Sequence, residues 1–218
     1  WDRYASVLSE RATSIFETSI TADLFLRLGR ISETKLDDLP RAAEAYAKSA
    51  EQGGDSRDVL MSLERVYAQL GDTRALVDVL ERRVGIENEA PVQADLHHRL
   101  ASLQIDALGD KAQGLATLRI ALERVPEHQA AREAVEKLLS DGALFDDAFD
   151  TLEGVYRSTN RGEELARLYE RRIDRDLLFF PWRIGCGLAG GNWMIVQPMV
   201  EAAFPDANWV RLPEEVDA

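Results

Sequence analysis

Apolar side chains recur at helical spacing through most of the chain, three or four positions apart. One such stretch consists of Leu60, Leu63, Val66, Tyr67, Leu70, Leu76, Val79, Leu80 and Val84. Short turn signals interrupt the pattern, as at Gly71-Asp72, Gly109-Asp110 and Asp141-Gly142. The pattern predicts ten helices and no strand up to residue 175, near residues 3–19, 22–36, 39–52, 57–70, 73–87, 91–108, 111–124, 127–140, 144–158 and 161–175.

The helical part also repeats itself at fixed offsets. Residues 23–38, DLFLRLGRISETKLDD, align with residues 95–110, DLHHRLASLQIDALGD, at an offset of 72. A second offset, of 89, sets LERVY (63–67) against LEGVY (152–156) and ERRV (81–84) against ERRI (170–173). Half of the first offset is about the length of one helix hairpin, and a single hairpin of that size cannot bury its apolar stripe alone. The repeats are therefore expected to stack.

These hairpins resemble the tetratricopeptide repeat family. Leu28-Gly29 and Leu100-Ala101 fit the large-small pair of that family's first helix, whereas Glu64 stands where a small residue is expected. The second-helix pattern is matched by Ala42, Tyr46 and Ser49, and again by Gly114, Leu118, Ala121 and Pro126. The resemblance implies a mainly α fold, a tetratricopeptide-like helix-hairpin α-solenoid over residues 1–175, whose surface binds a partner protein or peptide.

The composition changes after residue 175. Residues 176–218 contain three of the four Trp, four of the seven Pro and no Lys. Their pattern predicts a strand over Leu177–Trp182, a glycine loop over Ile184–Gly191, a helix from Asn192 to Phe204 and a second strand over Asn208–Leu212. The chain is thus expected to consist of a helical repeat domain (1–175) and a short C-terminal βαβ segment (176–218).

The glycine loop precedes a predicted helix, so its backbone N–H groups could bind an anion. The string RIGCGLAGGNW (183–193) resembles the C-terminal end of a macrodomain, the ADP-ribose-binding family, over about 40 residues. The resemblance implies contacts with ADP-ribose or a nucleotide phosphate by Ile184, Gly185, Cys186, Gly187, Leu188, Gly190, Gly191 and Asn192. The family's acidic catalytic positions hold Ala189 and Asn192, so at most a vestigial ADP-ribosyl hydrolase activity is implied.

Charge narrows the choice of partners. The chain has 26 Lys and Arg against 39 Asp and Glu, a formal net charge of −13, which disfavours nucleic acid and anionic membrane surfaces. Four arginines recur at the offset of 89 and are predicted to bind acidic groups of a partner: Arg82, Arg83, Arg171 and Arg172. The alternative is that they are solvated, pair with Glu81 or Glu170 and stabilise helix C-termini.

No catalytic or metal-binding pattern is recognised in the helical part. His97 and His98 are adjacent, so on a helix their side chains point about 100° apart, and His128 belongs to another segment. The chain's one cysteine, Cys186, cannot form an internal disulfide, which favours a reducing cytoplasm. No leader or membrane-spanning stretch is recognised either.

The sequence therefore predicts a cytoplasmic, non-enzymatic scaffold that binds a protein or peptide and carries no cofactor or metal. The alternative is recognition of ADP-ribose or a nucleotide phosphate by the tail. The unpaired edge of the predicted tail strand further predicts pairing with a second copy of the chain.

Overall fold

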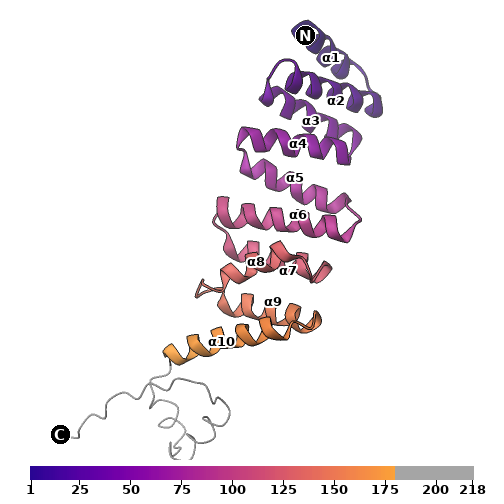
Figure 1. The fold of residues 1–218 in the computed structure, drawn as a ribbon. Helices are drawn as coiled ribbons and strands as arrows, with labels where there is room; N and C mark the ends of the chain where they lie inside the picture. Colours follow the sequence, from indigo (N-terminus) through magenta and orange to yellow (C-terminus); the bar gives the residue numbers. More distant parts are fainter. Residues whose placement is uncertain (180–218) are drawn as a thin grey trace, which may run out of the picture. The chain divides into compact units, whose positions relative to one another are not determined.

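The computed structural model describes residues 1–179, and every regular element in that range is helical (Figure 1). The chain divides into two compact units, Trp1–Arg161 and Gly162–Ala218. The described part of the second unit is α10 (Gly162–Phe179). The first unit contains the helices α1 (Asp2–Ser14), α2 (Thr18–Thr34), α3 (Leu39–Gly53), α4 (Arg57–Leu70), α5 (Thr73–Ile86), α6 (Ala90–Ser102), α7 (Lys111–Arg124), α8 (Gln129–Leu138) and α9 (Phe145–Ser158), with a π-helical turn, η1 (Leu103–Ala107), after α6.

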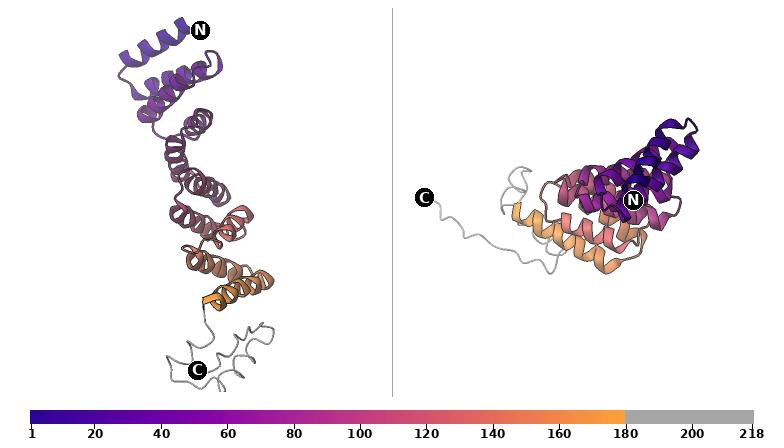
Figure 2. Two further views of the ribbon diagram at one scale, coloured as in Figure 1. Left: turned by 90° about the vertical axis from the view of Figure 1, so that its left-hand side faces the viewer. Right: turned by 90° about the horizontal axis from the view of Figure 1, so that it is seen from above.

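The ten predicted helices are confirmed, with differences at their ends. α1 ends at Ser14, five residues before the predicted end, and the predicted helix 91–108 consists of α6 and the π-helical turn η1. In the first unit each helix packs against the next along the chain, and Figures 1 and 2 show this succession from three directions. This order is the one expected for stacked helix hairpins.

Three separate clusters of buried apolar side chains follow one another from α1 to α6. The first joins α1, α2 and the α3 residue Ala45, the second joins α3 and α4 to Val79 of α5, and the third joins Leu80 of α5 to Leu96 and Leu100 of α6. Burial of this apolar area is the main favourable contribution to folding. Because each cluster involves only neighbouring helices, the stability of this region is divided along the stack.

A glycine allows α2 and α3 to approach closely. A Cβ atom on Gly29 would lie 2.5 Å from both Cδ1 and Cε1 of Tyr46, whose side chain is fully buried. The Ser49 hydroxyl donates a 2.8 Å hydrogen bond to the carbonyl oxygen of Ala22 between the same two helices. Gly29, Tyr46 and Ser49 are residues on which the resemblance to the repeat family rests, and here they form contacts between the two helices of one hairpin.

Aspartates begin three alternate helices. Asp38, Asp72 and Asp110 precede α3, α5 and α7, and each carboxylate accepts a hydrogen bond of 3.0–3.1 Å from the backbone N–H three residues later. Such caps satisfy an N–H group that the helix leaves without a partner. Gly71 and Gly109 stand directly before two of these caps with φ of 70° and 72°, a conformation that favours glycine. The predicted turns Gly71-Asp72 and Gly109-Asp110 therefore each end one helical segment and cap the next helix.

The C-terminal strand is not where the sequence predicts it. Leu177–Phe179 are the end of α10, so the prediction of a strand from Leu177 is wrong for these residues, and no strand occurs within residues 1–179. Extending a formed helix by a turn costs little, whereas a strand needs a partner. The remaining predicted elements of the βαβ segment, from residue 180 on, lie outside the described residues, and the division at 175 and 176 stays a prediction.

Candidate binding groove

An open groove of about 630 Å³ lies over α4, α5 and α6 of the first unit. The helix α4 forms most of its wall, because residues three or four positions apart share a helix face. Met61 and Ala68 supply exposed apolar surface beside charged side chains. The full lining consists of Met61, Glu64, Arg65, Ala68, Gln69, Arg83 and Arg99.

Two arginines from different helices converge on Glu64. Arg83 of α5 donates to Oε2 of Glu64, and Arg99 of α6 forms an ion pair with Oε1 of the same carboxylate. The Glu64 side chain is 11% exposed and that of Arg83 12%, whereas Arg99 remains 52% exposed. A buried carboxylate is costly unless it is paired, so Glu64 accounts for why both guanidinium groups are held here.

A second ionic cluster fixes Arg65 at the same groove. Arg65 donates from Nε (2.5 Å) and Nη2 (2.8 Å) to the two carboxylate oxygens of Glu33, which also accepts a 2.8 Å hydrogen bond from the Tyr46 hydroxyl. The hydrogen bond from Arg65 lowers the pKa of Glu33, while burial and the Glu33 carboxylate raise the pKa of Tyr46 to about 12. At neutral pH Glu33 is therefore charged and Tyr46 protonated.

The groove is positive although the chain as a whole is acidic. Its lining holds three guanidinium groups and one carboxylate. Glu33 offsets the charge of Arg65, and the remaining set of Arg83, Arg99 and Glu64 carries a net charge of +1. Guanidinium N–H groups that are not engaged by these carboxylates can donate to the oxygen atoms of an anionic ligand.

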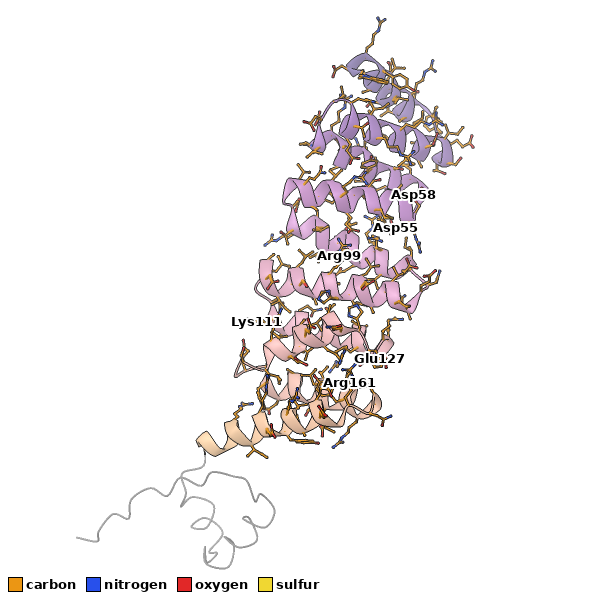
Figure 3. All side chains as sticks on the ribbon, viewed as in Figure 1. Asp55, Asp58, Arg99, Lys111, Glu127 and Arg161 are labelled. Atoms are coloured by element: carbon orange, nitrogen blue, oxygen red, sulfur yellow. The ribbon has the colours of Figure 1, made fainter. Side chains whose placement is uncertain are left out.

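Arg82 and Arg83, the first predicted pair of partner-binding arginines, lie in different surroundings. Arg83 lies in the groove, whereas Arg82 donates to Asp55 from Nε (3.1 Å) and Nη2 (2.5 Å) and lies 3.7 Å from Asp78. Asp55 belongs to the connection between α3 and α4, and Arg99 extends from α6 toward α5 and α4 (Figure 3). Arg82 is thus paired with Asp55 of the preceding connection and with Asp78 of its own helix, and Arg83 is paired with Glu64 of α4.

The other predicted site residues belong to the second unit. Arg171 is exposed and Arg172 half-buried on α10. The glycine-loop residues Ile184–Asn192 lie outside the described residues, so their predicted contacts with ADP-ribose or a nucleotide phosphate stay predictions. Within residues 1–179 no helix is long and apolar enough to cross a membrane, and no three His, Cys, Asp or Glu side chains are grouped for a metal ion.

Of the two adjacent histidines, one is buried and the other lies beside His128, which is distant in the sequence. His97 is buried, and neither of its ring nitrogens has a hydrogen-bond partner. The adjacent His98 instead lies with its ring centroid 5.7 Å from that of His128. His128 caps α8 by accepting from the backbone N–H of Ala131, and its Nε2 lies 2.9 Å from Asp95. The adjacent histidines therefore face different surroundings, as the predicted divergence on a helix requires.

Comparison with known proteins supports the helical repeat. Residues 148–179 match the family model of the tetratricopeptide repeat. The match takes in most of α9 and all of α10 and ends at Phe179, so it overlaps the first four residues of the segment predicted to resemble a macrodomain, 176–218. The described residues form an all-α helical repeat, and α9 and α10 are its part that matches the tetratricopeptide repeat. No curated protein matches the chain.

Several solved structures are similar at low identity. A crystal structure of MamA is 15% identical with a TM-score of 0.44, covering 73% of this chain and 89% of that one. A second MamA structure is 17% identical with a TM-score of 0.38, covering 90% and 100%. The structure of YrrB, described as a TPR protein with an unusual peptide-binding site, is 18% identical with a TM-score of 0.37, covering 78% and 92%.

Most residues of the groove carry no signal in the sequence. The sequence pattern indicates Arg83 as a partner-binding residue, but it does not indicate Met61, Arg65, Ala68, Gln69 or Arg99. The one signal that could have located the site was Glu64, a charged residue at a position where the equivalent residues of neighbouring hairpins are Gly29 and Ala101. A charge at a position otherwise occupied by small residues requires partners, and those partners form the groove.

Proposed function

We propose that the chain is a non-enzymatic scaffold that binds a segment of a partner protein in the groove over α4, α5 and α6. The observation that carries this proposal is the groove itself, where side chains of three successive helices line one open surface. Stacked helix pairs commonly present such surfaces to extended or helical segments of other proteins.

The form of the groove favours a polypeptide over a small molecule. Small-molecule sites are concave and cover most of the ligand's surface, whereas this groove is open along helix α4. The groove offers apolar contacts through Met61, which is 46% exposed, and hydrogen-bonding contacts through its arginines. A peptide segment supplies both kinds of group along its length.

The proposal is tested with the variant Ala68→Trp, which fills the groove at an exposed helix position. Binding of a displayed random peptide library to the whole chain is measured, and selected peptides are titrated. We expect Ala68→Trp to weaken binding at least tenfold. The matched control is Ala112→Trp, at an exposed alanine of α7 outside the groove, which should bind like the unmodified chain. Equal binding by both variants would contradict the proposal.

Of the four predicted partner-binding arginines, Arg83 is the one that lies in the proposed groove. Partner binding by Arg82, Arg171 and Arg172 stays a prediction. The cytoplasmic location and the pairing of two copies through the tail also stay predictions.

The alternative function, ADP-ribose binding through the glycine loop, has its own test. Calorimetric titration of ADP-ribose into the chain should show saturable binding that Gly187→Glu removes, if the tail is a working site.

A further inference from the structure

The groove contains a carboxylate at a position where the neighbouring hairpins have small residues. Glu64 occupies a first-helix position at which the neighbouring hairpins have Gly29 and Ala101. The buried carboxylate and Arg83 therefore belong to the hairpin of α4 and α5, and Arg99 contacts the same carboxylate from α6 of the next hairpin. This local departure from the repeat coincides with the groove.

The hydrogen-bonding capacity of the two arginines exceeds what Glu64 uses. A guanidinium group has five N–H donors. The contacts described for Arg83 and Arg99 engage one nitrogen of each with Glu64. Arg99 is also half exposed, with 52% of its side chain accessible. Donor groups therefore remain at the groove surface, already oriented by a buried carboxylate.

The charge balance leaves these two arginines as the positive part of the groove. Arg65 is held by both oxygens of Glu33. The hydrogen bond from the backbone N–H of Asn88, then that from Glu89 and the charges of Arg57 and Arg83, lower the pKa of Glu87. Its carboxylate also accepts from Arg57 at 2.6 and 2.8 Å. Among the described residues, Glu64 is the carboxylate that forms ion pairs with both Arg83 and Arg99, while Glu87 pairs with Arg57, so the set of Glu64, Arg83 and Arg99 keeps one net positive charge.

We propose that the partner segment is acidic, and that Arg83 and Arg99, held by Glu64, together bind a carboxylate of that segment. This inference rests on the proposed function. A carboxylate matches the planar donor pattern of a guanidinium group and forms charge-assisted hydrogen bonds with it. Met61 and Ala68 lie along the same wall and accept an apolar side chain next to the acidic one. The expected partner therefore combines acidic and apolar residues in one short segment.

The test uses two fluorescein-labelled peptides and the full chain. One peptide alternates glutamate and leucine, and the other has glutamine in place of every glutamate. Fluorescence anisotropy should show the glutamate peptide binding at least tenfold more tightly than the glutamine peptide. Equal affinities would overturn the inference, and tighter binding of the glutamine peptide would do so as well.

Variants then locate the preference. Arg99→Gln should reduce affinity for the glutamate peptide about tenfold and leave the glutamine peptide unaffected, and Arg99→Lys should restore part of the loss. The control is Arg119→Gln on α7, an exposed arginine outside the groove that is paired with Glu123, which should change neither affinity. Circular dichroism and thermal unfolding verify that each variant is folded. An unchanged glutamate affinity in folded Arg99→Gln would overturn the assignment.

The same data separate this inference from the proposed function. If both peptides bind equally and Ala68→Trp blocks both, the groove binds peptides without preferring acids. If neither peptide binds and Ala68→Trp has no effect on the selected library peptides, the proposed function fails and the inference fails with it.

Discussion

At the residue scale, Gly29 sets how closely α2 can approach α3. Replacement by alanine would place a methyl group 2.5 Å from two ring carbons of the fully buried Tyr46. The ring would have to move, and Tyr46 also donates to Glu33 at the groove. We therefore expect Gly29→Ala to lower the free energy of unfolding by about 1–3 kcal/mol, the usual cost of overpacking a core. Chemical denaturation monitored by circular dichroism measures this change.

Gly154 provides the matched control. It lies exposed within α9, and a Cβ atom there would meet nothing within 4 Å. Gly154→Ala should stabilise the chain, by up to ~1 kcal/mol, because alanine has the better helix propensity and a less flexible unfolded state. If Gly29→Ala were as stable as Gly154→Ala, the close contact with Tyr46 would not exist in solution.

A second residue-scale prediction concerns pH. Burial lowers the pKa of His97 below 6.5, and the charge of Arg124 lowers it further. As the pH falls below 6.5, the unfolded chain therefore takes up a proton at His97 before the folded chain does, and the folded state loses stability. We expect the melting temperature to decrease between pH 7.5 and pH 5.5, and the decrease to be smaller in His97→Phe.

The control for this prediction is His98→Gln. The pKa of His98 is lowered first by burial and then by His128 and Lys137, against an opposing effect of Asp95, so His98 should contribute a separate part of the same decrease. The Glu33 carboxylate, whose pKa is also lowered, affects stability only in the more acidic range where carboxylates titrate. An identical pH dependence in the unmodified chain and His97→Phe would show that His97 is not buried in its neutral form.

Local spacing in the sequence predicts the helix faces and turns but not the contacts of Glu64. Helix faces, turns and the large-small pairs follow from local spacing, and they are found where predicted. The partners of Glu64 lie 19 and 35 positions later, at Arg83 and Arg99. No local rule relates residues so far apart, because their contact depends on how successive hairpins stack. Arg82 and Arg83 are indistinguishable in sequence for the same reason, although they face different carboxylates.

At the scale of elements, the offset of 72 relates whole helices. It carries α3 onto α7, α4 onto α8 and α5 onto α9, with their first residues in register. It also carries α2 onto α6 together with η1. The residues 103–107 therefore remain helical, but in the wider π form, which the apolar period does not distinguish from an α-helix. A repeat in sequence has thus predicted helix positions more accurately than helix type.

The second offset has a different structural meaning. By the offset of 72, α9 corresponds to α5, a second helix of a hairpin. By the offset of 89 and by the family match over residues 148–179, α9 is instead a first helix. The helix between the hairpins is α8, which has 10 residues, and α9 packs against α7 as well as α8. One additional short helix therefore changes the alternation, and the two offsets found in the sequence are both correct.

At the scale of the whole stack, the first unit should not respond to a mutation as one cooperative body. Leu28 and Leu100 are equivalent at the offset of 72 and almost equally buried, at 4% and 5% exposure, but they belong to separate clusters. Truncating a buried leucine to alanine costs about 2–5 kcal/mol, and in stacked repeats this loss acts mainly on neighbouring helices.

We expect Leu100→Ala to increase amide hydrogen exchange in α5 and α6 at least tenfold with little change in α1 and α2. Leu28→Ala should give the reverse pattern, since its cluster joins α1 and α2. Exchange monitored by mass spectrometry on both variants measures this, and an equal increase over all helices in each would establish instead that the unit opens only as a whole.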